Sequence, residues 1–437
     1  MHVVWQGRNS SHPESQALSP ATERIQTSRT RCPDLPLTHT TLSNGCSLDQ
    51  SMSGSVLFPA SSCKPGSGEV RVSLLLPSTP NLSTLRYTYP LKLIPSIPHV
   101  ILSGRRDDSD AEHQREGTKA LPRITSVPLL FLLTYGGGLL PQDTIDFSIK
   151  LDKGTRLAIA TQGSTKIYKF EAVQAPASTC TSPSQQAATQ TLSVHLGSLS
   201  ALLYLPHPTQ PFAHSKYRQD QTFTLCVGAS LATIDWVSCG REARGERWLM
   251  DAYRSKTEVW VEEDIERDAE RERGDRFAQP PLPKRRLLLR DTVLLEPSFG
   301  ASPNHTIPAR MEPLTLVATL ILIGPVFASL SAFFLREFSL LPRIGARGFD
   351  KVAHPMNEHG TAQSRAEEQQ AWRQNRLTEE KLHGILWTAA SVRDDRAVVV
   401  RFGSRDGEAG RRWIKDMIDC EGSVLADWGK GAMGGLS

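Results

Sequence analysis

The chain has 437 residues, with 50 Lys and Arg against 46 Asp and Glu, and hydrophobic residues make up 39 % of it. The resulting net charge of +4 is too small to indicate a protein that binds nucleic acid or a membrane surface through a broad basic face. A wholly disordered chain would contain fewer hydrophobic residues, and a protein with many membrane spans would contain far more.

The first segment, residues 1–62, is rich in Ser, Thr, Pro and Gln and shows no sustained hydrophobic period. We expect a disordered extension there. Several arginines raise the alternative of an organelle presequence, but Glu14, Glu23 and Asp34 interrupt it, and such sequences contain few acidic residues. No secretory signal is expected, because no apolar core follows residues 1–8.

From about residue 66 onward, apolar and polar residues alternate in several runs. Ile145, Phe147, Ile149 and Leu151 form one such run, and another is Phe223, Leu225 and Val227. A period of two is typical of strands with one buried face, and turn signals separate the runs. No helical pattern occurs between residues 135 and 236, which argues against a βαβ array. We therefore predict a mainly β, largely antiparallel domain over 63–425 and a flexible tail over 426–437.

Three polar and charged stretches have the composition of inserts in this domain. They cover about residues 103–118, 258–276 and 352–381. We expect the second to be a solvated helix or loop and the third an exposed helix with flanking coil.

An apolar run of 22 residues without a charge, Leu314 to Leu335, would be long enough to cross a bilayer as a helix. This leaves a single-span, membrane-anchored interaction protein as an alternative function. The other interpretation divides the run at Gly324-Pro325 into a buried strand and an amphipathic helix. The apolar face of that helix would carry Phe327, Leu330, Phe334, Phe338 and Leu341, and the other face Ser329, Ala332, Arg336 and Glu337.

Several short motifs follow one another along the rest of the chain. They are Leu133-Thr-Tyr-Gly-Gly-Gly-Leu139, Asp143-Thr-Ile-Asp146, Thr161-Gln-Gly-Ser-Thr-Lys-Ile-Tyr168, Leu205-Pro-His-Pro208, Pro211-Phe212, Asp235-Trp236, Gly240-Arg241 and Ala243-Arg-Gly-Glu246-Arg-Trp248. In this order and spacing, the set resembles the urease accessory protein UreD family, in a fungal-type version with an N-terminal extension and inserts. The resemblance covers about residues 66–418 apart from the inserts, and it favours the strand-and-helix interpretation of the apolar run.

The resemblance implies a protein that is not an enzyme but a chaperone-like scaffold, which helps to insert nickel into apo-urease in the cytoplasm. The implied partners are the helical protein UreF, the GTPase UreG and apo-urease, with neither nucleic acid nor membrane, and the nickel ion is held only transiently. The implied fold is a β-helical-like stack of strand layers with about two helices.

The distinctive motifs supply the candidate conduit or interface residues, namely Tyr135, Gly136, Gly137, Gly138, Asp143, Gln162, Lys166, Asp235, Arg241, Arg244 and Glu246. The three glycines allow either a turn at a passage or interface, or a bulge or corner in the sheet. Carboxylates such as Asp235 and Glu246 suit the passage of a divalent ion, but they would equally cap turns or pair with Arg241, Arg244 or Lys166. Trp236 is expected in the core.

The candidate soft nickel ligands are His195, His207, His214, Cys226 and Cys239. None of them shows the spacing of a preformed site, so buried thiols and surface imidazoles are the alternative. The seven cysteines are odd in number and contain no Cys-x-x-Cys pair, which argues against a disulfide scaffold and favours a reducing compartment.

Motifs of nucleotide hydrolysis and of nucleophilic catalysis are absent from the sequence. No G-x-x-x-x-G-K-[ST] occurs, so we expect this chain to bind no nucleotide and the GTP to belong to a partner. No G-x-S-x-G elbow occurs either, which leaves a hydrolase reading with little support.

Overall fold

The computed structural model describes residues 64–75, 79–100, 126–169, 187–263, 284–297, 306–341 and 360–436. These residues belong to the unit Cys63–Ser437. The predicted extension over 1–62, the insert over 103–118 and most of the insert over 258–276 lie outside the described residues.

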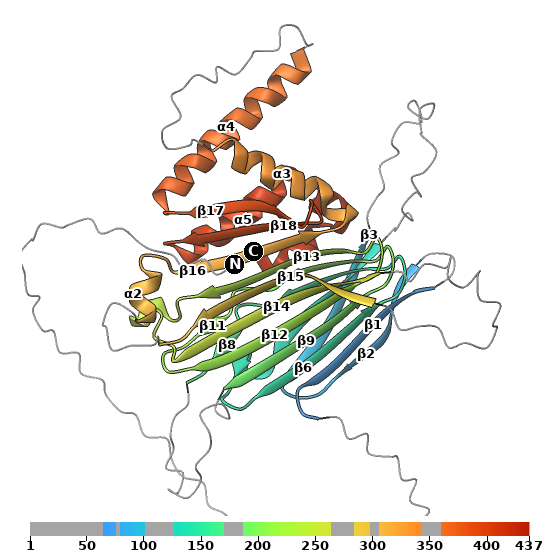
Figure 1. Ribbon diagram of the computed structural model, residues 1–437, viewed down its shortest axis with the longest axis vertical. Helices are drawn as coiled ribbons and strands as arrows, with labels where there is room; N and C mark the ends of the chain where they lie inside the picture. Colours follow the sequence, from blue (N-terminus) through green and yellow to red (C-terminus); the bar gives the residue numbers. More distant parts are fainter. Residues whose placement is uncertain are drawn as a thin grey trace, which may run out of the picture. The chain divides into compact units, whose positions relative to one another are not determined.

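Strands dominate the described part of the chain, which confirms the prediction of a mainly β fold (Figure 1). They are β1 (Ser67–Leu75), β2 (Thr79–Tyr87), β3 (Leu91–Val100), β4 (Ser126–Thr134), β5 (Gly138–Leu139), β6 (Thr144–Leu151), β7 (Arg156–Thr161), β8 (Lys166–Ile167), β9 (Ala188–Leu196), β10 (Ala201–Leu205), β11 (Gln210–Pro211), β12 (Lys216–Leu225), β13 (Ser230–Ser238), β14 (Ala252–Glu263), β15 (Lys284–Leu295), β16 (Leu316–Ile323), β17 (Leu386–Val392) and β18 (Ala397–Ser404). They form a seven-stranded sheet (β15-β14-β12-β9-β6-β1-β2), an eight-stranded sheet (β17-β18-β16-β13-β10-β7-β4-β3) and a three-stranded sheet (β11-β8-β5).

The central strands wind through the three sheets in turn, as the β-helical expectation implied. From β4 to β12, the chain visits the eight-stranded, the three-stranded and the seven-stranded sheet, and then repeats that order. Each turn returns to a given sheet in the same direction, so β6–β9, β9–β12, β7–β10 and β10–β13 pair in parallel. The prediction of largely antiparallel pairing is wrong for these strands, because alternation reveals which face is buried but not which strand lies alongside. Antiparallel pairs, such as β1–β2, β14–β15 and β16–β18, occur toward the sheet margins.

Two hydrophobic cores hold the layers together. One lies between the two large sheets and includes Val194, Phe223 and Leu231. The other lies between the eight-stranded sheet and the C-terminal helices and includes Leu320 and Trp413. Strands of the eight-stranded sheet are therefore buried on both faces, which is why β13 and β16 show hardly any polar alternation.

The apolar run over 314–335 divides as the second interpretation predicted. It forms β16, a short 3-10 segment η6 (Pro325–Phe327) and the first residues of helix α3 (Ala328–Ser339). Among the described residues, no helix is long and apolar enough to cross a membrane. One residue of α3 was placed wrongly: Glu337 is fully buried. Three arginines surround its carboxylate, and their charges allow an acid on the buried face.

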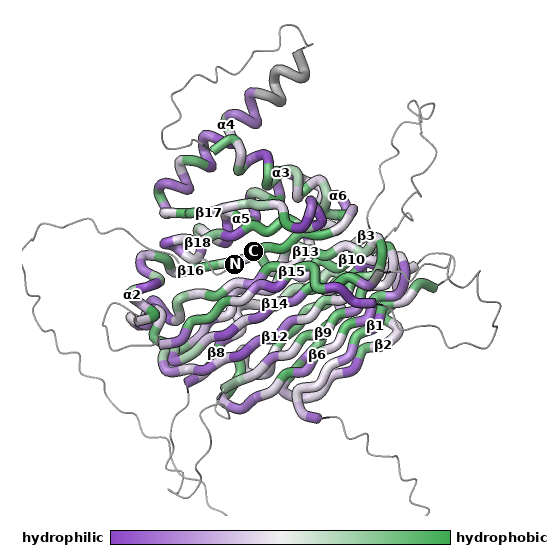
Figure 2. Tube along the Cα trace, viewed as in Figure 1, coloured by the Kyte–Doolittle hydropathy of each residue, from purple (hydrophilic) through white to green (hydrophobic). Residues whose placement is uncertain are grey.

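The described part contains more helices than the expected two or so. They are α2 (Ile307–Met311), α3, α4 (Gly360–Leu382), α5 (Gly407–Glu421), α6 (Ser423–Trp428) and the 3-10 segment η7 (Lys430–Leu436). Figure 2 shows α4 mostly in the colours of hydrophilic residues, in line with the exposed helix predicted for the third insert. However, its Arg376 and Glu380 are buried.

Three further expectations need correction. The end of the chain is not a flexible tail throughout, because Trp428, Met433 and Leu436 are buried in the second core. The start of the second insert is not a solvated helix or loop, because residues 258–263 continue β14. Val227 is half exposed rather than inward-facing, since β12 already ends at Leu225.

Candidate functional site

The short three-stranded sheet brings three of the motifs to one corner of the winding chain. Gly138 pairs with Lys166 across β5 and β8, and Lys166 pairs with Gln210 across β8 and β11. β8 therefore lies between β5 and β11, and its Lys166 is adjacent to residues 28 and 44 positions away in the sequence. The motif glycines form the corner between two sheets, as one of their two interpretations predicted.

Two different structural constraints require glycine at the positions of this corner. Gly136 and Gly137 have φ angles of +76° and +71°, which L side chains rarely adopt. Gly138 is extended, but a Cβ atom there would lie 2.4 Å from the carbonyl oxygen of Lys166. The hydroxyl of Tyr168 donates a hydrogen bond to the carbonyl oxygen of Gly136 at 3.0 Å. The close approach of the Gly138 and Lys166 backbones and the hydrogen bond from the Tyr168 hydroxyl therefore fix the corner.

A stack of side chains extends from this corner to the Arg241–Glu246 motif. The rings of Tyr168 and Phe212 meet edge to face at 5.3 Å between centroids. Phe212 also contacts Arg241, whose guanidinium carbon lies 4.0 Å from the centroid of the Phe212 ring in a cation–π interaction. Arg241 also forms a two-pronged ion pair with Glu246, which accepts a further hydrogen bond from the backbone N–H of Ala213 at 3.2 Å. Hydrogen bonding from Arg241 lowers the pKa of Glu246.

This pairing bears on how the two charged motif residues act. Arg241 fixes a carboxylate of its own chain, and Glu246 is the partner that the pairing interpretation foresaw. Glu246 does not line the interior cavity described next. The two residues form one structural unit at the corner.

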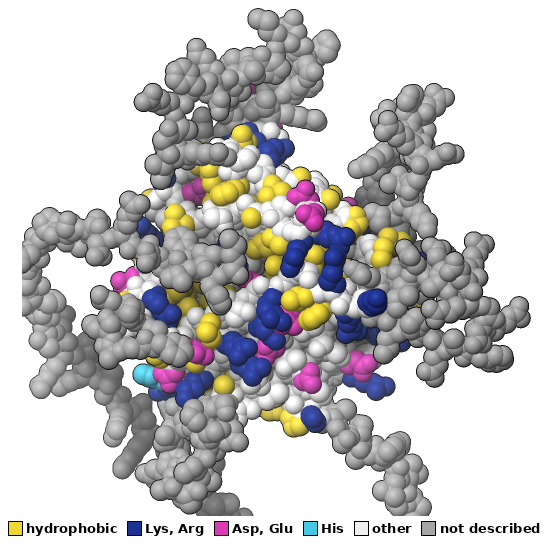
Figure 3. All heavy atoms as spheres, viewed as in Figure 1, with side chains coloured by type: hydrophobic (Ala, Val, Ile, Leu, Met, Phe, Trp, Pro, Cys, Tyr) yellow, Lys and Arg dark blue, Asp and Glu magenta, His cyan; other side chains and the backbone are white. Residues whose placement is uncertain are grey.

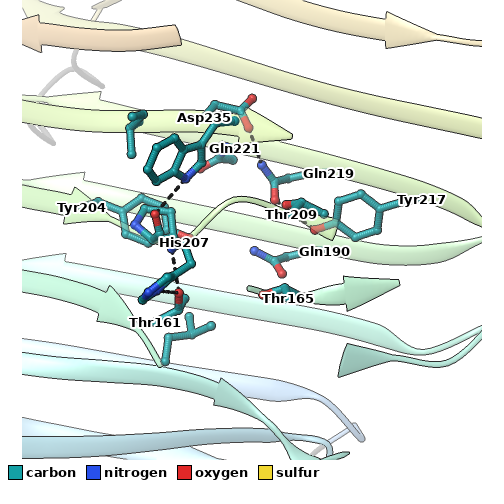
Figure 4. Close-up of a pocket in the computed structure, with 14 residues that line it drawn as sticks. Thr161, Thr165, Gln190, Tyr204, His207, Thr209, Tyr217, Gln219, Gln221 and Asp235 are labelled. Atoms are coloured by element: carbon teal, nitrogen blue, oxygen red, sulfur yellow. Dashed lines mark hydrogen bonds between the residues drawn. The ribbon is translucent and has the colours of Figure 1, made fainter. Parts of the chain in front are cut away.

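A polar cavity lies inside the winding, between the two large sheets (Figure 4). Its volume of about 20 Å³ is enough for about one water molecule. Figure 4 shows polar side chains converging on it from strands of both sheets and from the connections after β7 and β10. The polar residues of the lining are Thr161, Thr165, Gln190, Tyr204, His207, Thr209, Tyr217, Gln219, Gln221 and Asp235.

Asp235 is the acidic residue of this lining. Its carboxylate accepts hydrogen bonds from the hydroxyl of Ser255 and from Nε2 of Gln219. Burial raises the pKa of Asp235 to about 6, although the hydrogen bond from Ser255 lowers it. Asp235 is therefore held by neutral groups, and the expected alternative of an ion pair with Arg241, Arg244 or Lys166 is wrong for this residue.

The cavity also contains a polar atom that a guest molecule could satisfy. In the described part of the chain, Oε1 of Gln221, a residue of this lining, is buried without a hydrogen-bond partner. The ring of His207, one of the candidate soft ligands, is half buried, and its Nδ1 lies 3.1 Å from Oγ1 of Thr161. The donors are oxygens and one imidazole, and they do not form a closed ligand set.

The remaining motif residues lie outside the cavity. Asp143 caps a turn by accepting a hydrogen bond from the N–H of Leu140 at 2.7 Å. Four others have exposed side chains, namely Tyr135, Gln162, Lys166 and Arg244. Trp236 is buried, as predicted, and its Nε1 donates to the carbonyl oxygen of Pro206 at 2.8 Å.

The candidate soft ligands fall into different environments. Cys239 is buried, and burial raises the pKa of its thiol to about 11, so a thiolate ligand is disfavoured there. His214 is exposed and contacts Asp251. His195 and Cys226, however, lie close together on the seven-stranded sheet, with 3.9 Å between Nε2 and Sγ.

Reasoning from the sequence missed most of the cavity. Gln219 and Gln221 lie on the same buried face of β12 as Phe223, and less buried residues alternate with them. The period of two along this strand therefore already predicted that both side chains point inward. Glutamine at an inward position is the signal that could have found them. Ser255 and Gln190 carry no comparable signal, because their place depends on which strands become neighbours.

Comparisons of the sequence with a family model and with known proteins all find urease accessory proteins. The family model described as UreD urease accessory protein matches residues 112–430. Urease accessory protein 4 of Cryptococcus neoformans var. grubii is 28 % identical over 382 residues, which cover 83 % of this chain and 93 % of that protein. Urease accessory protein UreD of Anaeromyxobacter sp. is 31 % identical over 285 residues, covering 65 % and 70 %. Urease accessory protein D of Arabidopsis thaliana is 32 % identical over 207 residues, covering 47 % and 58 %.

Proposed function

The chain belongs to the UreD family of urease accessory proteins, and we propose that it is a non-catalytic maturation factor that helps to load nickel into apo-urease. The proposed partners are a UreF-like helical protein, a UreG-like GTPase and apo-urease itself, in the cytoplasm. Support comes from the family match, which extends over most of the described domain.

The observation that carries the nickel part of the proposal is the polar interior around Asp235. A buried carboxylate without a cationic partner is costly to retain, and the surrounding groups are oxygen donors from both large sheets. Nickel(II) is a borderline ion that accepts oxygen and imidazole ligands, so such a lining suits a moving cation. An incomplete ligand set suits a cargo that must leave again.

The size of the cavity limits how the cargo passes. Room for about one water molecule excludes an ion with a full hydration shell. We propose that the ion exchanges waters for side-chain oxygens of Asp235, Gln219 and Gln221 as it moves. The strands around them would have to separate locally for the ion to enter.

The corner of the three-stranded sheet is the proposed partner-binding region. Tyr135 and Tyr89 are exposed, and their rings lie 5.4 Å apart at the end of β4 and the start of β3. Leu140, also exposed, follows β5 at the same corner. Exposed aromatic and aliphatic side chains of this kind are typical anchors for a helical partner.

Genetic complementation tests the proposal. In a urease-positive host whose own UreD homologue has been deleted, expression of this chain should restore urease activity at low external nickel. Excess nickel should restore part of the activity in the deletion strain without it, because loading then becomes less dependent on the factor. Failure of the soluble chain to restore activity when its UreF and UreG partners come from the same source would contradict the proposal.

A further inference from the structure

A second group of potential metal ligands lies away from the polar interior, on the seven-stranded sheet. His195, Cys226 and Glu262 each offer a ligand atom, and these three atoms all lie within 4.8 Å of one another. The contacts are 3.9 Å between Nε2 of His195 and Sγ of Cys226, and 3.3 Å between that Sγ and Oε2 of Glu262. Nδ1 of His195 lies 4.0 Å from Oε1 of Glu262.

The topology explains why three residues so far apart in sequence meet. β9, β12 and β14 are adjacent and parallel, so their carboxyl ends lie at one edge of the sheet. Leu225, the last residue of β12, is in register with Leu196 of β9 and Val261 of β14. Cys226 follows Leu225, Glu262 follows Val261 and His195 precedes Leu196. The inward-facing side chains are Leu196 and Leu225, so His195 projects from the opposite face of the sheet.

We propose that His195, Cys226 and Glu262 form a binding site for a borderline divalent transition-metal ion, with zinc(II) as the reference ion. One imidazole nitrogen, one thiolate sulfur and one carboxylate oxygen are the donors that such ions accept, and three protein ligands leave a position for water or another donor. On binding, the Cys226 S–H gives its proton to solvent and its sulfur bonds the metal, while His195 binds through a neutral ring nitrogen.

The surroundings of the site predict reversible rather than tight binding. The His195 side chain is 35 % exposed, so solvent reaches the site. Nε of Arg285 lies 3.1 Å from Oε1 of Glu262, and Lys150 is opposite His195 on β6. Arg285 and Lys150 offset the negative charge of the carboxylate and thiolate, and Arg285 competes with the metal for Glu262. Figure 3 shows Lys and Arg side chains interspersed with acidic ones on the face of the molecule that is turned toward the viewer.

The geometry also separates this site from the nickel passage proposed above. None of its three residues lines the cavity around Asp235. The proposal therefore does not depend on the proposed function, and each can fail without the other.

Titration of the purified full-length chain with zinc(II), and absorption spectroscopy with cobalt(II), test the site. The wild type should bind cobalt with a thiolate-to-metal charge-transfer band, which zinc removes and magnesium or calcium does not. Cys226→Ser should abolish the band, and Glu262→Gln should weaken zinc binding by at least about 100-fold, since even outer partners of a ligand contribute about 10- to 100-fold. Arg285→Ala should strengthen binding, because a competing cation is removed.

Matched variants make the test specific. Cys420→Ser removes another reduced cysteine that is exposed, and His214→Gln removes an exposed imidazole; neither should change the spectrum. Retention of the band in Cys226→Ser, or its absence in wild type that is folded by circular dichroism, would overturn the proposal. Loss of the band in Cys420→Ser alone would also overturn it, by assigning the thiolate elsewhere.

Discussion

Ser255 of β14 donates its hydroxyl hydrogen bond to the carboxylate of Asp235 on β13, so a polar contact joins the seven-stranded and the eight-stranded sheet inside the protein. Gln219 donates a second hydrogen bond to the same carboxylate at 3.4 Å. These two neutral donors only partly compensate burial, because the pKa of Asp235 is still raised to about 6. A group that costs stability when ionised points to a role other than stabilising the fold.

The raised pKa of Asp235 predicts how stability depends on pH. Between the ordinary value of 3.8 and about 6, the folded protein binds more protons at this site than the unfolded chain. The free energy of unfolding that this residue contributes therefore falls as pH rises through that window. Relative to wild type, Asp235→Asn should gain about 1 to 3 kcal/mol between pH 4 and pH 7. Urea unfolding at a series of pH values measures the difference, and a difference that stays constant with pH would contradict the raised pKa.

A second prediction concerns the buried carboxylate of Glu337 in α3. It forms an ion pair of 2.7 Å with Arg373 and one of 3.6 Å with Arg376, whose side chain is only 5 % exposed. Burial opposes ionisation, but the hydrogen bond and charge of Arg373 outweigh it, and the pKa of Glu337 is lowered. Glu337→Gln should lower the free energy of unfolding by about 3 to 5 kcal/mol, because it removes the carboxylate shared by Arg373 and the buried Arg376, which then keeps, among the described residues, only a 3.7 Å ion pair with Glu380.

The control for Glu337 is a partner of the same carboxylate at the surface. Arg336 is 56 % exposed, so Arg336→Ala should cost less than about 1 kcal/mol. Since the folded-state pKa of Glu337 is depressed, the stabilisation is present at neutral pH and lost as pH falls below the ordinary value of 4.5. Two results would contradict this account of α3 and α4. One is a similar decrease in the free energy of unfolding for Glu337→Gln and Arg336→Ala, and the other is a stabilisation by Glu337 that persists at acid pH.

A third prediction separates the glycines of the corner. A methyl group at Gly138 would collide with the backbone of Lys166, so Gly138→Ala should prevent pairing of β5 with β8 and sharply reduce soluble yield. A side chain at Gly136 meets no atom within 4 Å, and only its positive φ is unfavourable. Gly136→Asn should therefore cost about 1 kcal/mol or less. Thermal unfolding and soluble yield measure both, and equal behaviour would show that proximity to Lys166 is not the constraint.

The sequence predicted the parts of the fold that depend on local pattern. Alternation over 145–151 gave a strand with the correct buried face, and Gly324-Pro325 divided the apolar run correctly. The burial of Glu337 could not be inferred, because it depends on arginines of α4 about 36 residues later. Parallel pairing could not be inferred either, since it arises from the winding of the whole chain.

The candidate site was also predictable only in part, because the sequence shows its motifs but not which strands become neighbours. Order and spacing of motifs selected Gly138, Lys166, Arg241 and Glu246, which the structure brings to one corner through direct pairing and the Tyr168–Phe212 stack. Asp235 was selected as well, but it lies in the interior cavity instead. Glu262 was not selected, because only the register of β12 and β14 places it beside Cys226.

The pairing of Arg241 with Glu246 predicts non-additive effects of substitution. Arg241→Ala and Glu246→Ala each break the same ion pair. The first leaves the Glu246 carboxylate without its partner, and the second leaves the Arg241 guanidinium held at the corner only by its contact with Phe212. Each should weaken binding of the UreF-like partner, and the double variant should be little worse than either single one. Pull-down with the co-expressed partner measures this, with Arg336→Ala, an exposed arginine of α3 outside the corner, as the control. Additive losses would show that the two residues act separately.

The role of Asp235 in nickel loading is the central claim and has a direct test. Apo-urease is co-expressed with its UreF-like and UreG-like partners and with wild-type chain, Asp235→Asn or Asp146→Asn, the last being an exposed acid on β6. Nickel bound per purified urease is then measured, together with urease activity and recovery of the accessory complex. We predict that Asp235→Asn still enters the complex but lowers nickel loading at limiting nickel by at least about tenfold, equivalent to about 1.4 kcal/mol of lost stabilisation. Asp146→Asn should load nickel like wild type. Full nickel loading with Asp235→Asn would contradict the claim that the ion passes this carboxylate.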